Sequence, residues 1–171
     1  MKIIFSSILV IFLFFTNQAF TEQKIAFIDM DKIISTSNAG KKIQNSLDKF
    51  AKKENQKFDN IESDLKKKEQ EILKQKNIIS KEELDKKVKS FRSELSKLRK
   101  EKIEFNRSII KINQEATNKM VNEINKILTQ YASDNSVSLV IQKKNIIIGK
   151  TELDITPQIL KEFNSKVKSI D

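Results

Sequence analysis

The carboxylates of Asp29 and Asp31 are the first side chains whose type and spacing could do chemistry, because paired carboxylates bind divalent cations. They stand two residues apart at the end of an apolar run, with no further ligand nearby. Roles in a turn or a helix cap therefore suit them better. The chain contains no His and no Cys, which removes the usual proton shuttle, disulfides and the common nitrogen and sulfur metal ligands. We predict no metal site and no cofactor.

Nucleotide chemistry is not expected either. The stretch "NAGKKI" at residues 38–43 lacks the upstream Gly of a phosphate-binding loop, and no Ser or Thr follows Gly40 and Lys41. No nucleophile stands in a recognisable pattern with a base. We therefore predict that the protein is not an enzyme.

The middle of the chain, residues 41–131, carries two series of apolar residues at helical spacing. The first series is Ile43, Leu47, Phe50, Phe58, Ile61, Leu65 and Ile72. The second is Leu84, Val88, Phe91, Leu95, Leu98, Lys102, Phe105, Ile109, Ile112 and Ala116, a seven-residue repeat. Between them Ser80 and Glu83 form a capping box that begins a new helix. The pattern predicts two helices of roughly 40 and 50 residues that fold back as an antiparallel hairpin, on the order of 60 Å long, with its tip near 77–81.

Both ends of the mature chain predict β-strands. "KIAFIDM" at 24–30 is a short strand, and "NSVSLVIQ" at 135–142 alternates apolar and polar residues. "KKN" is a predicted turn, after which "IIIG" would complete a hairpin as a third strand. A last helix follows, for which we predict Thr156 as the cap and Pro157 as the first residue.

The predicted fold is α+β and mostly α. A small β-rich head, made from residues 22–40 and 132–171, holds the roots of a long antiparallel coiled-coil arm, residues 41–131. A head of about 60 residues is small for a stable core, so we expect it to form an oligomer. The apolar residues assigned to this oligomerisation head are Ile25, Phe27, Val137, Leu139, Ile141, Ile146 and Ile148.

The amino terminus predicts export. Lys2 precedes an uncharged apolar run from Ile3 to Phe15, which is short for a spanning helix and typical of a signal peptide. We assign residues 1–21 to this peptide, with cleavage near 19–21. A retained membrane anchor is the alternative.

Positive charge is concentrated in the arm. The net charge is +10, and residues 41–131 hold 24 Lys and Arg against 15 Asp and Glu, which gives +9. Two explanations remain open: a solvated helical surface, or attraction of an acidic partner that salt would screen. Nucleic acid is not expected, because only Arg92, Arg99 and Arg107 could make bidentate contacts with bases and an exported chain leaves the chromosome.

Several motifs together resemble one family. The apolar amino terminus, "KIAFIDMDKI", "SNAGKK", a Lys-rich helical hairpin and "SLVIQKKNIIIGKTELDITPQILKEFN" are similar to the Skp/OmpH family of periplasmic chaperones. The resemblance implies a homotrimer with a β-rich head and three helical arms around a cavity. It also implies binding of unfolded outer-membrane proteins in the periplasm, without ATP, to prevent their aggregation. Some members are described as binding lipopolysaccharide through basic arm residues.

Both basic and aromatic residues of the arm are candidates for contact with such a client. Arm candidates are Lys66, Lys67, Lys86, Lys87, Phe58 and Phe91. The phenylalanines are most simply residues of the helical seam, and contact with a client is the alternative. A second function class also stays open, namely a structural coiled coil of the cell envelope or a binder of anionic surfaces such as lipid or lipopolysaccharide.

Overall fold

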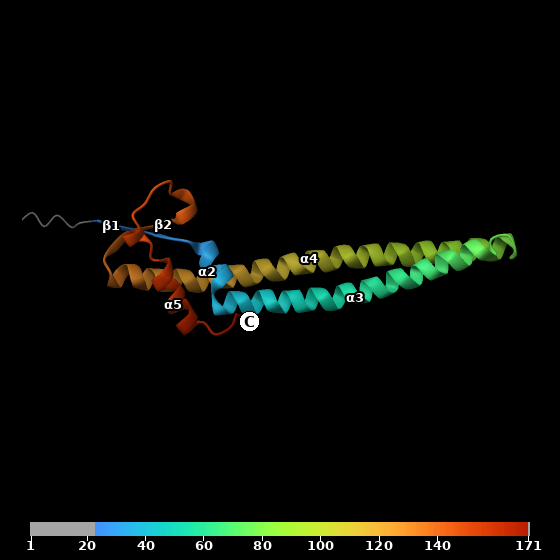
Figure 1. Ribbon diagram of the computed structural model, residues 1–171, viewed down its shortest axis with the longest axis horizontal. Helices are drawn as coiled ribbons and strands as arrows, with labels where there is room; N and C mark the ends of the chain where they lie inside the picture. The colour runs from blue at the N-terminus through green and yellow to red at the C-terminus, as the bar shows by residue number, and fades with distance from the viewer. Residues whose placement is uncertain (1–22, 171) are drawn as a thin grey trace, which may run out of the picture.

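A computed structural model describes residues 23–170 of the chain. Two long helices extend side by side from a small head (Figure 1). The elements in order are β1 (Lys24–Ile28), α2 (Met30–Thr36), α3 (Asn38–Gln75), α4 (Lys81–Asp134), β2 (Val137–Gln142), two 3₁₀ turns (Lys143–Asn145 and Thr151–Leu153) and α5 (Thr156–Lys166). The predicted mostly helical fold with a small β head is confirmed. The predicted signal peptide, residues 1–21, lies outside the described residues.

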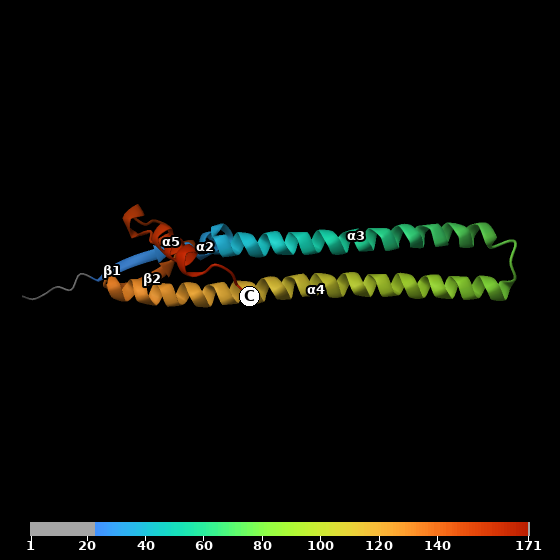
Figure 2. The ribbon, with the colours of Figure 1, turned by 90° about the horizontal axis from the view of Figure 1, so that it is seen from below.

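The arm is an antiparallel pair of α3, with 38 residues, and α4, with 54 residues. Figure 2 shows the two helices running alongside each other from the head to the tip. At the tip the hydroxyl of Ser80 accepts a hydrogen bond from the backbone N–H of Glu83, and the Glu83 carboxylate accepts one from the N–H of Ser80. The predicted capping box is therefore confirmed as the start of the returning helix.

Aromatic and leucine side chains form the seam between the arm helices. Phe58, Leu65 and Leu98 are buried, and Phe91, Leu95 and Phe105 pack against them. The Phe105 ring lies 5.6 Å from the rings of both Phe50 and Phe58, measured between centroids. Phe91, Leu95, Leu98 and Phe105 belong to the predicted seven-residue series, and Phe50, Phe58 and Leu65 belong to the first apolar series, so the two series together predicted this seam.

Two ion pairs connect α3 to α4 beside this seam. Lys68 lies 2.6 Å from Glu94, and Lys102 lies 2.6 Å from Glu62. The hydrogen bond from Lys68 lowers the pKa of Glu94, and the charge of Lys68 adds to this effect. Because all four groups are largely exposed, the pairs contribute little to stability. They favour one register of the helices over its neighbours.

The core of the head is built on the carboxyl-terminal part of α4. Its buried residues come from β1, α2, the start of α3, α4 and α5: Ala26, Ile28, Ile33, Ala39, Met120, Ile124, Ile127, Ile155, Ile159 and Phe163. Three of them, Met120, Ile124 and Ile127, fall within the range that the sequence assigns to the arm. One helix therefore serves both parts, with its last turns inside the head.

The sheet of the head has two parallel strands. Ile25 lies opposite Leu139, Ala26 opposite Val140 and Phe27 opposite Ile141. Ala26 and Ile28 are buried toward the core. Parallel strands need a long crossover connection, and here the whole helical arm is that connection.

The predicted third strand, "IIIG" at 146–149, is wrong. Within residues 23–170 the sheet has only β1 and β2. Lys143–Asn145 forms a 3₁₀ turn that does not bring the chain back onto β2. The chain instead crosses the ring of Phe27, where a Cβ on Gly149 would lie 2.9 Å from the ring carbon Cε1. In this segment, contact with the Phe27 ring takes the place of pairing with β2.

Candidate functional site

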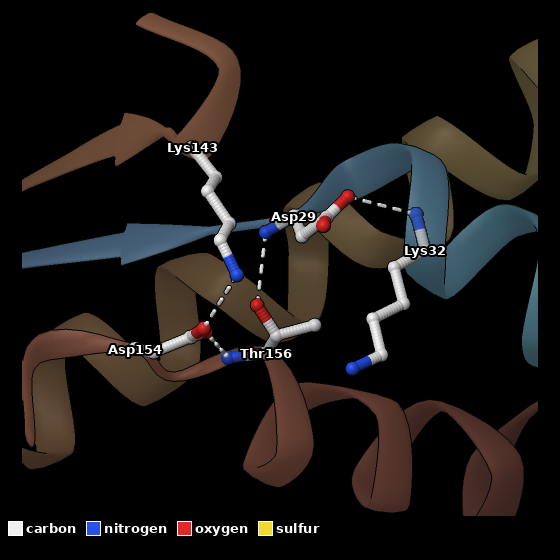
Figure 3. Close-up of polar contacts among 5 residues, drawn as sticks. All are labelled: Asp29, Lys32, Lys143, Asp154 and Thr156. Carbon is white, nitrogen blue, oxygen red and sulfur yellow. Dashed lines mark hydrogen bonds and ion pairs between the residues drawn. The ribbon is translucent and has the colours of Figure 1, made fainter. Parts of the chain in front are cut away.

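The polar motifs of the head form a latch, which we define as Asp29, Lys143, Asp154 and Thr156. Figure 3 shows these side chains between the end of β1 and the start of α5. The backbone N–H of Asp29 donates to the hydroxyl of Thr156 at 2.9 Å, and the N–H of Thr156 donates to Asp154 Oδ1 at 2.9 Å. Lys143 Nζ donates to Asp154 Oδ2 at 3.3 Å. The latch joins three segments that are far apart in the sequence.

The latch settles two capping predictions. Asp29 caps α2, because its carboxylate accepts from the backbone N–H of Lys32 at 2.9 Å, as predicted. The prediction for α5 was wrong. Its N-cap is Ile155, whose side chain cannot cap, and Pro157 is the second residue of the helix. Thr156 is the first residue of the helix, and its hydroxyl accepts from the backbone N–H of Asp29.

Asp154 is kept ionised by its surroundings. Burial raises the pKa of this carboxyl, but hydrogen bonds from the side chain and backbone of Thr156, together with Lys143, outweigh burial and lower the pKa below its ordinary value. An ionised carboxylate accepts these hydrogen bonds better than a protonated one. The ionised carboxylate therefore stabilises the contact between these segments of the head.

"SNAGKK" marks a tight corner between α2 and α3. The buried hydroxyl of Ser37 accepts from the N–H of Gly40 at 3.1 Å and caps α3. A Cβ on Gly40 would lie 1.7 Å from the carbonyl oxygen of Ile34. Only Gly permits this approach, a role that the sequence analysis missed because it requires knowing that two helices meet here.

Across residues 23–170 no three His, Cys, Asp or Glu side chains are grouped as metal ligands would be. The residues with functional potential are instead spread over two surfaces, one on the head and one on the arm.

The surface of the head is apolar. Ile25 and Leu139 lie opposite each other on the outer face of the sheet and are 46% and 51% exposed, and Ile148 is 91% exposed. Phe27 shares this face but is covered by the segment that contains Gly149. Ile141 is half-buried, Ile146 packs near Gly149, and Val137 packs against the head core. The predicted head residues thus divide into an exposed outer group and a packed group.

The surface of the arm is basic. Lys66, Lys67, Lys86 and Lys87 are all exposed, and their contact with a client stays a prediction. Phe58 is buried in the seam, and Phe91 packs against the same cluster. Both phenylalanines therefore stabilise the arm and are withdrawn from contact in this conformation.

A groove of about 550 Å³ opens between α3 and α4 next to the head. Its walls include Leu47, Phe50 and Ile112, and Ile170 from the carboxyl-terminal segment lies at its edge. Lys42 Nζ donates to the carbonyl oxygen of Lys168 at 2.9 Å, which holds that segment beside α3. The groove is open to solvent, and Lys42, Glu115 and Lys119 also line it.

A family model described as "Outer membrane protein (OmpH-like)" matches residues 24–163, which include the head, the arm and the latch. The chain belongs to the OmpH-like family. The crystal structure of an OmpH-like protein from Caulobacter crescentus CB15 has the same fold, with a TM-score of 0.80 at 13% sequence identity, over 87% of this chain and 88% of that one. No curated protein sequence matches. Among the helices described in residues 23–170, none is long and apolar enough to cross a membrane.

One pair of exposed residues in this OmpH-like arm was missed by the sequence analysis. Ile103 and Ile110 of α4 are 52% and 57% exposed. They are seven residues apart but out of step with the seam positions Leu98, Phe105 and Ile112. Their spacing relative to the seam could have identified them from the sequence, because apolar residues outside the seam register point toward solvent.

Proposed function

We propose that the protein is an ATP-independent holding chaperone of the periplasm, which binds unfolded outer-membrane proteins and prevents their aggregation. Membership of the OmpH-like family supports this proposal. The Caulobacter protein of the same fold is described as a candidate outer membrane chaperone. The observation that carries the proposal is the arm itself, a basic hairpin 38 and 54 residues long that is rooted at both ends in one small head.

The arm suits an unfolded chain better than a small ligand. Unfolded barrel strands expose apolar side chains and unpaired edges, which aggregate. A long surface can hold such a chain through many weak contacts, without a deep pocket. The net charge of +9 in residues 41–131 would speed the encounter with acidic clients.

The head would assemble the chaperone as a homotrimer. The head leaves Ile25 and Leu139 of the sheet 46% and 51% exposed, and Ile147 and Ile148 of the segment after β2 99% and 91% exposed. Apolar groups at this density favour burial against another copy of the chain. Three arms would then project from the joined heads around a shared space. Export by the amino-terminal segment would place this trimer in the periplasm.

Protection of a client tests the proposal. An outer-membrane barrel protein diluted from urea should stay soluble with the full protein and precipitate without it. A shortened chain provides the control: residues 55–108 are replaced by the natural tip turn, 76–80, which spares every head-core residue. This chain should form the same oligomer yet fail to protect. Equal protection by the shortened chain would show that the arm is only structural.

Two variations of this experiment, one with added salt and one with lipid vesicles, distinguish electrostatic capture of the client from binding to an anionic surface. The rate of client capture should fall as ionic strength shortens the Debye length below about 8 Å, whereas the rate of release should change less. Changing Lys66, Lys67, Lys86 and Lys87 to Gln should have the effect of high salt. Binding to anionic vesicles without protection of the client would favour the anionic-surface function instead.

A further inference from the structure

All three arginines of the protein lie on one face of α4. Arg92, Arg99 and Arg107 are seven and eight residues apart, and Ile103 and Ile110 stand between and after them. At 100° per residue these five positions fall within about 80° of the helix circumference. We call them the Arg–Ile stripe.

The stripe points away from α3. The seam residues Leu98 and Phe105, which pack against α3, lie roughly 140–160° around α4 from Ile103. All three arginines are exposed, and Ile103 and Ile110 are 52% and 57% exposed. The stripe is therefore a solvent-facing row and not part of the arm's own packing.

No carboxylate neutralises the arginines. Within residues 23–170 every ion pair uses Lys as the cation, and none involves Arg92, Arg99 or Arg107. Of the nearby acidic residues of α4, Glu94 contacts Lys68 and Glu101 lies 3.8 Å from Lys97. Glu104, three residues before Arg107, is exposed and makes no ion pair with it. The three guanidinium groups keep their full hydrogen-bonding capacity for a partner.

The chemistry of the stripe differs from that of the surrounding lysines. A guanidinium binds a carboxylate with two parallel hydrogen bonds and stacks on aromatic rings, which an ammonium does less well. Isoleucines between the arginines add apolar contact. From Arg92 to Ile110 the stripe spans about 27 Å, which corresponds to roughly eight residues of extended chain.

We propose that the Arg–Ile stripe binds an extended polypeptide segment that carries acidic and aromatic side chains, as unfolded barrel strands with aromatic girdles do. The inference rests on the proposed chaperone function and names the part of the arm that contacts the client. Arginine supplies the ion pairs and the stacking, and isoleucine receives the apolar side chains.

The test replaces guanidinium groups with ammonium groups, so that the charge of the stripe stays the same. Arg92→Lys, Arg99→Lys and Arg107→Lys together should weaken binding of a fluorescent peptide that alternates Glu with Phe and Tyr by about tenfold or more, measured by anisotropy, since each bidentate pair and stack is lost. Ile103→Ser with Ile110→Ser should weaken it further. Leu73→Ser, at a 59% exposed position on α3 outside the seam series, should change little.

A relocation variant is the matched control. In the triple Lys background, Lys49→Arg, Lys52→Arg and Lys53→Arg restore the total number of arginines but place them on α3, at exposed positions, and affinity should not return. Recovery would overturn the inference, because arginine content and not position would then matter. Circular dichroism should show the same helix content in every variant.

The outcomes separate this inference from the proposed function. If wild type protects the barrel protein and the triple Lys variant binds and protects equally, the stripe is not the contact surface while the chaperone function stands. If the substitutions weaken only binding to phosphatidylglycerol vesicles, the partner is a lipid surface and the inference is overturned. If wild type does not protect the client, both proposals fall.

Discussion

The carboxylate of Asp154 accepts hydrogen bonds from two segments of the head, and its lowered pKa makes stability depend on pH. Because the folded pKa lies below the unfolded value of about 3.9, the stabilisation is complete above that value and is lost as pH falls through the folded pKa. At pH 7, Asp154→Asn should lower the urea midpoint of unfolding. The difference from wild type should shrink toward pH 3.

Glu152→Gln is the control for this prediction, since Glu152 is an exposed carboxylate of the same segment. Its unfolding midpoint should track wild type across the pH range. If Asp154→Asn lowers the urea midpoint as much at pH 3 as at pH 7, the charge of the carboxylate does not stabilise the latch.

Ser136 carries a backbone strain that glycine would relieve. It follows the cap of α4 with φ of 55°, the only positive φ among non-glycine residues in the described chain. Glycine adopts this conformation without steric cost. Ser136→Gly should raise the free energy of unfolding by about 0.5–1 kcal/mol, measured by urea titration. Ser138→Gly in β2, where the backbone is extended, should lower it by a similar amount.

The contrast between Asp29 and Asp154 shows which polar roles the sequence could predict. Asp29 caps the helix that begins at the next residue, so its role is local and was expected. Asp154 and Thr156 act on Lys143 and on β1, which is over 100 residues away. Spacing along the sequence could not predict these contacts, because the fold of the arm determines which residues of the two distant segments meet.

At the scale of the elements, the corner between α2 and α3 depends on Gly40. Alanine is the better helix former by about 1 kcal/mol, yet its Cβ would meet the Ile34 carbonyl at 1.7 Å. Gly40→Ala should therefore destabilise the protein by about 1–3 kcal/mol or more, through displacement of one helix. Lys41→Ala, at the next and exposed position, should be nearly neutral. Thermal unfolding of both variants gives the comparison, and a neutral Gly40→Ala would refute the close approach.

At the tip, Ser80→Ala should remove the capping bond to Glu83 and cost about 1 kcal/mol locally. Hydrogen exchange should rise in residues 75–90 and stay unchanged in the head, since α4 can fray at its start without disturbing its last turns. Faster exchange in β1 or β2 would contradict an arm whose tip is independent of the head.

The helices were predictable because their signals are local and repeated. The capping box and the seam spacing of Leu98 and Phe105 required no knowledge of the rest of the molecule. The strand predicted at 146–149 failed because a run of isoleucines is compatible with any apolar surface. Here Ile146 and Gly149 lie near the Phe27 ring, while Ile147 and Ile148 are 99% and 91% exposed.

At the scale of the whole molecule, the outer face of the sheet should decide the oligomeric state. Leu139→Asp places a charge where wild type has a half-exposed apolar side chain. If that face is buried between copies, the unpaired charge should cost several kcal/mol and release monomers. Light scattering should show a trimer for wild type and for the strand control Ser138→Asp. A trimeric Leu139→Asp would place the contact elsewhere.

The parallel pairing of β1 with β2 also governs the order in which the chain can fold. Lys24 Nζ contacts the carbonyl oxygen of Asn135 across 111 residues of sequence, so the first strand to leave the ribosome lacks its partner until most of the chain has been made. The loop between them would be entropically costly to close if it were flexible. If the helical hairpin forms first, the ends of this connection are separated only by the width of two helices. The arm then brings β1 and β2 close enough to pair.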